Sequence, residues 1–413
     1  MDKDLFQSLK QKILQRKEHL TCKSGSYLAD IIYDFTKLTQ IDSQAFSYYG
    51  SLTPTIEILK KNNSIRLYIS SKNDLNNLRL NHHNNVNRHH YKPSFYQSTN
   101  NELICHAAST DIAIHTMRGL ARVISMLKEN LNPKIHIEID NKNDTNCFNQ
   151  DIIINQKVII CRIESAIRFY SLYLAEKFKI IDKKEVIKLK INTEIKRLYN
   201  SPQIELFELI HKLKLKGLLE IDNEKHHGFI RIQNIKIFNN KITLIQLPWG
   251  IELSMELANY LYKSKPQNVG IVGGVGLIKA NNLNIDDLVI PKSLALKDLD
   301  TKIYLSLNNN ILNNNDLYKT DNITTFPKLS MSSSLPATDE FDTVEMENFI
   351  LALGAQRSNS SICIGNYIMD KPKEGYGLGK TYYSRKFLLD LFNKEHRGKD
   401  KALYYVSKQL NIF

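Results

Sequence analysis

The sequence predicts an α/β protein in which a sheet domain follows a mostly α-helical first domain. The chain has 413 residues, more than one domain usually holds, which suggests two domains. Apolar residues recur at helical spacing in the first half. From about residue 229 onward, short β-rich runs alternate with helical stretches, as in an α/β sheet. We therefore expect a mostly helical domain of unknown role over residues 1–200 and an α/β domain over residues 201–413.

Helical periodicity in the first half is clearest over residues 6–20 and 113–127, and the second stretch stops at Asn132-Pro133. A further helix is expected from about Ile159 to Lys179. Core packing is the plain explanation of these apolar stripes.

A polar, Asn-rich stretch over residues 72–101 separates the helical patterns and contains His82, His83, His89 and His90. Four clustered histidines raise the hypothesis of a metal site. No carboxylate or cysteine lies among them, however, so a solvated loop is favoured and no metal is expected.

Composition and charge narrow the functional classes. With 42% hydrophobic and 24% charged residues, the chain has the composition of a globular protein. Its five cysteines are scattered without a CxxC pair, which argues against a disulfide framework or a zinc site. The balance of 56 basic and 43 acidic residues gives a net charge of +13, but the basic residues are dispersed without the interleaved aromatics of a nucleic-acid module. Nucleic acid is therefore disfavoured as a partner.

The chain shows no apolar run of the roughly 20 residues that a membrane span needs. Its first residues, MDKDLFQSLKQKILQRK, carry charges where a signal peptide would be apolar. These features predict a cytoplasmic protein without a membrane partner.

The second half predicts its elements in a definite order. Strands and helices alternate, with glycines at the end of one strand, and an Asn-rich surface excursion at residues 308–315 interrupts them. The expected strands cover residues 229–238, 241–247, 268–274, 286–291 and 361–368, and the expected helices cover residues 252–264, 349–355 and 384–410.

Glycines at strand ends mark the first candidate site. Gly250 follows an apolar strand in the segment Leu247-Pro248-Trp249-Gly250, and Gly273 and Gly274 end the next strand. Glycines there allow backbone N–H groups to approach a ligand at the edge of an α/β sheet. A purely structural turn is the more frequent explanation of such a pair.

Acidic residues mark two further segments. Glu345, Met346 and Glu347 stand where an extended segment becomes a helix, so one carboxylate could bind sugar hydroxyls while Met346 packs on an apolar ring face. A charged helix start stabilised by the helix dipole is the alternative. Asp370 follows the apolar strand of residues 361–368 and precedes Lys371-Pro372, which suits a rigidly held general acid.

In this order and at these separations, the segments resemble the nucleoside phosphorylase and nucleosidase superfamily, and AMP nucleosidase most closely. The shared motifs are the glycine turn of residues 269–277, the DDLVIP strand of residues 286–291, the VEMEN segment of residues 344–348 and the MDKP segment of residues 369–372. The resemblance covers about residues 229–413, and the first half matches no family we recognise.

The resemblance implies a three-layer α/β/α sheet domain of the nucleoside-phosphorylase type and an enzyme that cleaves the N-glycosidic bond of a purine nucleotide or nucleoside. Hydrolysis is preferred over phosphorolysis. Glu347 matches the family's ribose-hydroxyl ligand, Met346 its sugar-packing residue and Asp370 the acid that protonates the base. Glu345, Gly250, Gly273 and Gly274 complete the expected substrate site. No cofactor is expected, and the enzyme is expected to be a homo-oligomer.

Basic residues after Asp370 suggest that the substrate carries a phosphate. Lys371, Lys373, Lys380, Arg385 and Lys386 follow the expected acid closely, and the Arg385 guanidinium can grip phosphate oxygens bidentately. A solvated basic surface is the alternative of equal weight.

The sequence also departs from the family. The family's first strand, with its glycine-rich turn, has no counterpart in residues 205–228, which leaves the nucleophile site unassigned. Met369 stands where a serine usually precedes the aspartate. Two other readings therefore stay open: a non-catalytic nucleotide-binding module with a degenerate fold, and a different small-molecule enzyme or interaction protein whose function lies in the helical half.

Overall fold

The structure is a computed structural model that describes the chain in separate ranges. From residue 154 onward these are residues 154–189, 204–223, 225–227, 230–248, 250–279, 283–297, 302–305, 318–325, 341–345, 347–370 and 385–413. Before residue 154 the structure describes residues 5, 7–9, 11–12, 15, 60, 64–69, 94–97, 103–107, 109 and 134–139. The predictions for residues 113–127, the four histidines and residues 308–315 lie outside the described residues.

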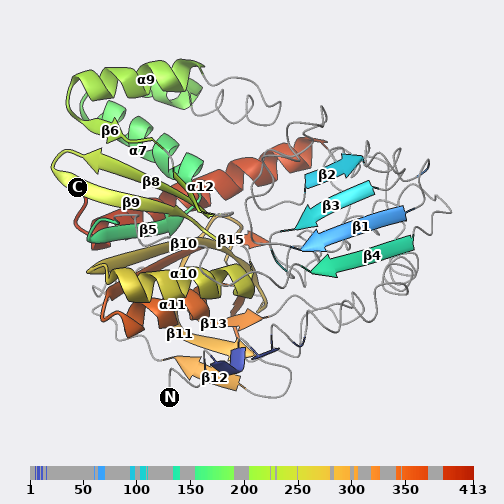
Figure 1. The fold of residues 1–413 in the computed structure, drawn as a ribbon. Coiled ribbons are helices and arrows are strands. Elements are labelled where there is room, and N and C mark those ends of the chain that lie inside the picture. Colours follow the sequence, from blue (N-terminus) through green and yellow to red (C-terminus); the bar gives the residue numbers. More distant parts are fainter. Residues whose placement is uncertain are drawn as a thin grey trace.

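One eleven-stranded sheet organises the described chain (Figure 1). Its strands follow the order β12-β11-β13-β14-β10-β5-β9-β8-β6, while β15 pairs with β10 and β11, and β7 pairs with β8. The strands are β5 (Lys157–Cys161), β6 (Leu219–Ile221), β7 (Lys225–His227), β8 (Ile230–Ile237), β9 (Asn240–Gln246), β10 (Asn268–Leu277), β11 (Leu288–Lys297), β12 (Lys302–Leu305), β13 (Tyr318–Thr325), β14 (Thr343–Glu345) and β15 (Ser361–Asp370). At its centre, β9, β5, β10 and β15 run parallel.

Helices cover both faces of this sheet. On one face lie α7 (Ile163–Lys177) and α12 (Arg385–Gln409), and on the other lie α10 (Ile251–Ser264) and α11 (Asn348–Arg357) (Figure 1). Side chains of β5 alternate between the two layers, because Ile159 packs into the core beneath α7 and Ile160 into the core beneath α10. The predicted α/β sheet of the second half is confirmed, with helices on both faces.

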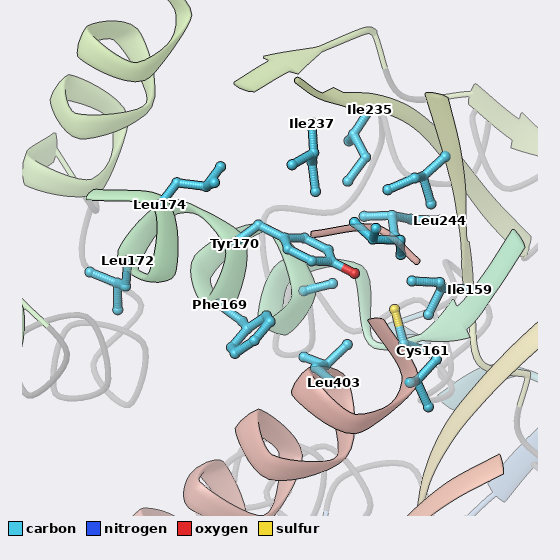
Figure 2. Close-up of a cluster of buried hydrophobic side chains, with 14 of the residues drawn as sticks. Ile159, Cys161, Phe169, Tyr170, Leu172, Leu174, Ile235, Ile237, Leu244 and Leu403 are labelled. Atoms are coloured by element: carbon cyan, nitrogen blue, oxygen red, sulfur yellow. The ribbon is translucent and has the colours of Figure 1, made fainter. Parts of the chain in front are cut away.

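The layer of α7 and α12 is joined around Tyr170. Figure 2 shows the Tyr170 ring among apolar side chains from β5, β9 and α12. Its hydroxyl lies 2.8 Å from Ser407 Oγ of α12, so the one polar atom of this buried ring has a partner. This contact links the two helices of the layer, as does the ion pair of 2.8 Å between Arg168 of α7 and Asp400 of α12.

Five strands of the sheet form a closed ring of ladders. β10 pairs with β15, β15 with β11, β11 with β13, β13 with β14, and β14 again with β10. Val275, Val289 and Ile368 of these strands share one small apolar cluster. The ring gives this end of the sheet a barrel-like character that the sequence did not predict.

A smaller sheet lies in the first half of the chain. It has the order β2-β3-β1-β4, with strands β1 (Ser64–Ile69), β2 (Ser94–Gln97), β3 (Leu103–Ala107) and β4 (Lys134–Ile139). These segments lie in the region expected to be mostly helical, and their strands were not predicted from the sequence. The alternation of apolar and polar residues in SIRLYI and KIHIEI has the period of a strand, not of a helix.

The segment around residue 160 also corrects the sequence prediction. The helix expected from Ile159 begins at Ile163, because the preceding residues form β5. A short β-branched run that is buried on both faces is hard to tell from the start of a buried helix by periodicity alone. The large sheet therefore draws on a strand that precedes the domain boundary expected at residues 200 and 201.

Candidate active site

The central parallel strands end at different levels and leave a gap in the ladder beside β10. The last pair between β5 and β10 joins Ile160 to Ile271, and β14 joins β10 only from Gly276 onward. Since β15 occupies the other side of β10, residues 272–275 have neither β5 nor β14 beside them. We call this stretch the ladder gap. It lies towards the carboxyl ends of the parallel strands, where open α/β sheets bind ligands.

Gly273 lies in the ladder gap and faces polar side chains. A Cβ atom built there would stand 3.7 Å from Asn366 Oδ1, 3.9 Å from Asn348 Oδ1 and 3.6 Å from Leu247 Cδ2. At Gly274, on the opposite side of the strand, a Cβ would stand only 3.0 Å from Met369 Sδ and 3.2 Å from the Tyr367 hydroxyl. Of the two predicted glycines, Gly273 therefore borders the polar group and Gly274 borders packed side chains.

Glu347 and Gly250, which the sequence placed in one site, are in contact. Glu347 is buried at the start of α11, and its Oε1 accepts a hydrogen bond of 2.9 Å from the Gly250 N–H at the start of α10. Gly250 has φ of 86°, a conformation that favours glycine. The bond holds a carboxylate between the first turns of two helices on the same face of the sheet.

Glu345 is held by donors from the protein itself. Its Oε2 accepts the backbone N–H groups of Glu347 and Asn348, the second at 2.6 Å. Its Oε1 accepts the Thr324 hydroxyl and, at 3.3 Å, the Asn322 amide. Glu345 thus ties β13 to the first turn of α11 and fixes the backbone from which Glu347 projects.

Burial dominates the protonation of Glu345. The side chain is 7% exposed, and burial raises the pKa of its carboxyl to about 7, although the bonds from Thr324 and from the backbone of Asn348 and Glu347 lower the pKa in part. The Glu345 carboxyl is therefore partly protonated near neutral pH.

Two buried asparagines join this cluster and were not predicted from the sequence. Asn348 Nδ2 donates to Asn366 Oδ1 at 3.1 Å, and both side chains are buried. Asn366 Nδ2 has no hydrogen-bond partner among the residues that the structure describes. A buried donor without a partner is costly, and beside the ladder gap it suits an acceptor atom of a ligand. An asparagine inside the apolar run SICIGNYIM was the signal in the sequence.

Asp370 is the last residue of β15, as the sequence predicted. Its backbone is in register with Gly276, next to a bulge between Val275 and Gly276. The strand therefore delivers Asp370 to the carboxyl end of the sheet, two pairs beyond the level of Gly274. The side chain of Asp370 lies outside the described part, as do Met346, Lys371 and the side chain of Arg385.

A charged cluster lies where β5 ends. Glu164, in the first turn of α7, bonds Arg231 of β8, and the Arg162 Nε lies 3.9 Å from Glu164 Oε2. Although burial opposes it, the charges of Arg231 and Arg162 hold the pKa of Glu164 well below its usual value. These residues were not predicted as site residues, because no motif of the second half includes β5.

Within the described ranges, no group of three or more histidine, cysteine, aspartate or glutamate side chains could hold a metal ion. Nor does any helix in that part of the chain have both the length and the apolar character to cross a bilayer.

No family model and no curated protein matches the chain. Several solved structures are similar to it. A 5′-methylthioadenosine/S-adenosyl homocysteine nucleosidase from Campylobacter jejuni has a TM-score of 0.41 and 16% identity, over 63% of this chain and 100% of that one. Futalosine hydrolase of Helicobacter pylori has a TM-score of 0.39 and 13% identity, over 62% of this chain and 98% of that one.

A purine nucleoside phosphorylase from Toxoplasma gondii has a TM-score of 0.37 and 13% identity, over 63% of this chain and 93% of that one. None of these three similar proteins is an AMP nucleosidase, so that finer assignment stays a prediction.

Proposed function

We propose that the chain cleaves the N-glycosidic bond of a purine nucleoside or nucleotide by hydrolysis, as the resemblance to AMP nucleosidase implies. The observation that carries the proposal is the buried Glu347 carboxylate bonded to Gly250, together with Asp370 at the end of strand β15. These positions support a hydroxyl acceptor and an acid in one site.

The residues suit the charges that develop in the reaction. When the bond between the anomeric carbon and the base breaks, its electron pair leaves with the base, and the ribose ring gains positive charge. Glu347 accepts hydrogen bonds from the ribose hydroxyls, which strengthen as the ring becomes cationic. Asp370 gives its proton to the base, the oxygen of water bonds to the anomeric carbon, and a proton from that water restores Asp370.

Asn366 supports a ligand at this place. Its Nδ2 has no partner within the described part of the chain, its Oδ1 is fixed by Asn348, and Gly273 leaves the space above it without a side chain. A ribose oxygen or the attacking water would satisfy this donor. The same amide would be a costly buried defect if the site never held a ligand.

A 5′-phosphate is the finer part of the proposal. Arg385 is the first residue of α12, so its guanidinium and the helix N-terminus would both favour an anion there. We expect Arg385→Ala to weaken cleavage of AMP while leaving adenosine cleavage unchanged. Equal loss on both substrates, or adenosine cleaved as well as AMP by the wild type, would remove the phosphate site.

The decisive experiment is a substrate screen of the purified full chain. AMP, adenosine and 5′-methylthioadenosine are incubated with and without inorganic phosphate, and chromatography separates the free base from ribose and its phosphates. Base release that needs no phosphate supports hydrolysis. Glu347→Gln should lower this release on ribosides, with the exposed Glu176→Gln on α7 as a matched control. Absence of base release from every substrate would refute an N-glycosidase of this class.

A non-catalytic nucleotide-binding module is the second candidate, and Met369 favours it. Its sulfur packs within 3.0 Å of the Cβ position of Gly274, directly before Asp370, where the family usually has a serine. In that case calorimetry would show nucleotide binding that depends on Glu347, while the screen would show no free base.

A further inference from the structure

Helix α9 (Ile204–Leu215) carries apolar residues on two opposite faces. Leu206, Leu209 and Leu213 are buried, and they face the rest of the fold, where α9 contacts α7 and β6. This first face is the ordinary apolar stripe of an amphipathic helix. In Figure 1, α9 lies at the outer edge of the fold, so its opposite face points away from the described sheet.

The opposite face exposes three large apolar side chains. Ile204 is 58% exposed, Phe207 67% and Leu215 75%. At 100° per residue these positions fall, with His211, on one stripe about 80° wide. Of the eight exposed large apolar side chains in the described part of the chain, three are on this stripe. We call it the outer stripe of α9.

Charges beside the outer stripe have opposite signs at the two ends of the helix. Glu205 lies in the first turn, Glu208 follows one turn later, and Lys212 lies in the last turn. By helical spacing these three side chains border the same edge of the stripe. The edge is therefore acidic towards the start of α9 and basic towards its end.

We propose that the outer stripe of α9 docks on the same stripe of a second copy of the chain, with the two helices antiparallel across a two-fold axis. A two-fold axis near residue 210 places Ile204 opposite Leu215 of the second copy. It also places Glu208 opposite Lys212 of the second copy, and Lys212 opposite its Glu208. An isologous interface needs a surface that complements itself in this way.

A parallel two-fold arrangement would instead set this edge of the stripe against the opposite edge of the second copy, so Glu208 and Lys212 would not face each other. The opposite charges of these two residues therefore favour the antiparallel arrangement. A contact between two helices of roughly 18 Å each is smaller than a standard interface, so the association should be weak and depend on concentration. It is independent of catalysis, since α9 contributes no residue to the candidate active site.

Sedimentation velocity of the full chain, from about 1 to about 100 μM, tests the proposal. We expect the wild type to show a larger, concentration-dependent species that Phe207→Asp lacks. Tyr304→Asp is the matched control, because Tyr304 is 58% exposed on β12, away from α9. If the chain also associates through a second interface elsewhere, Phe207→Asp should still form smaller species than the wild type, because it loses the association through α9.

A charge exchange tests the orientation. Glu208→Lys alone and Lys212→Glu alone should each weaken the association, because each places like charges at the facing positions 208 and 212. Mixing the two variants should restore it, since each acidic residue then meets a basic one. As a control, circular dichroism should show that both variants keep the helix content of the wild type.

The proposal is overturned if the wild type shows no association over this range, if Phe207→Asp and Tyr304→Asp sediment alike, or if the two charge variants fail to recover on mixing.

Discussion

The two faces of β10 use glycine for opposite purposes. Gly270 points towards α12, where an added Cβ would stand 2.3 Å from Val406 Cγ1 and 3.1 Å from Leu410 Cδ1. Gly273 points to the other face, where an added Cβ would stand no closer than 3.6 Å to any neighbour. The first glycine permits close packing of a helix on the sheet, and the second leaves room beside the amides of Asn348 and Asn366.

This difference teaches that a glycine-rich strand is not by itself a ligand-binding signal. In NVGIVGGVGL the glycines look alike in sequence, yet of Gly270, Gly273 and Gly274 only Gly273 borders the buried polar cluster. The packing face should therefore govern stability, and the site face should govern turnover. The following substitutions separate the two.

The largest effect is expected at the site, from Asp370→Asn. An amide cannot give a proton to the leaving base, so kcat should fall by about 10²–10⁴-fold while the melting temperature changes little. Base release in single-turnover reactions measures the change. Asp222→Asn, an exposed carboxylate outside the site, is the control. Near wild-type turnover in Asp370→Asn would remove Asp370 from the reaction.

On the packing face, Gly270→Ala should reduce the free energy of unfolding by about 1–3 kcal/mol, because the new methyl group overlaps Val406. Urea denaturation followed by far-UV circular dichroism measures this loss of stability. The kcat of the folded fraction should stay as in the wild type. If stability is unchanged, α12 can move away from β10 more easily than this packing implies.

On the site face, Gly273→Ala should leave stability nearly unchanged and weaken ligand binding. The methyl group fits without overlap, so the unfolding free energy should change by less than about 0.5 kcal/mol. It would, however, occupy space beside Asn366, and KM or the nucleotide Kd should rise about tenfold, equal to roughly 1.4 kcal/mol of binding energy. A variant that binds as tightly as the wild type would place the ligand elsewhere.

The smallest effect concerns pH and Glu345. Its folded-state pKa is raised, so the folded protein binds more protons than the unfolded chain between the ordinary glutamate pKa and about 7. Stability from this group is present at acidic pH and is lost as pH rises through that window. In Glu345→Gln this part of the pH dependence should disappear, as thermal unfolding between pH 5 and pH 8 would show. An unchanged profile would mean that Glu345 stays ionised throughout.

The sequence predicted the second half of the fold well because its periods are unambiguous. Strands β8, β9, β10 and β11 and helix α10 lie where β-branched runs and helical spacing placed them. Strand β5 was missed because its four consecutive buried apolar residues carry no period that separates a strand from a helix. The ring of ladders follows from pairing between distant segments, which local patterns do not encode.

The candidate site divides in the same way. The proximity of Glu347 to Gly250 was predicted from motifs, and the structure puts these two residues in contact. The partners of Glu345 were not predictable, since Thr324 and Asn322 come from a strand without a recognised motif. Asn366 was visible only as a polar residue in an apolar run, and its role depends on Gly273 lying beside it.

The closed ring of strands has a consequence for folding during translation. Of the described strands, β15 is the last to be synthesised, and it pairs with both β10 and β11. Until it emerges, β10 and β11 each present an unsatisfied edge to the cell, and such edges recruit other chains. The edge that bears Asp370 cannot form before that point. A nascent chain that stalls before residue 370 therefore keeps both edges open and is prone to aggregate, and it lacks the carboxylate of the proposed acid.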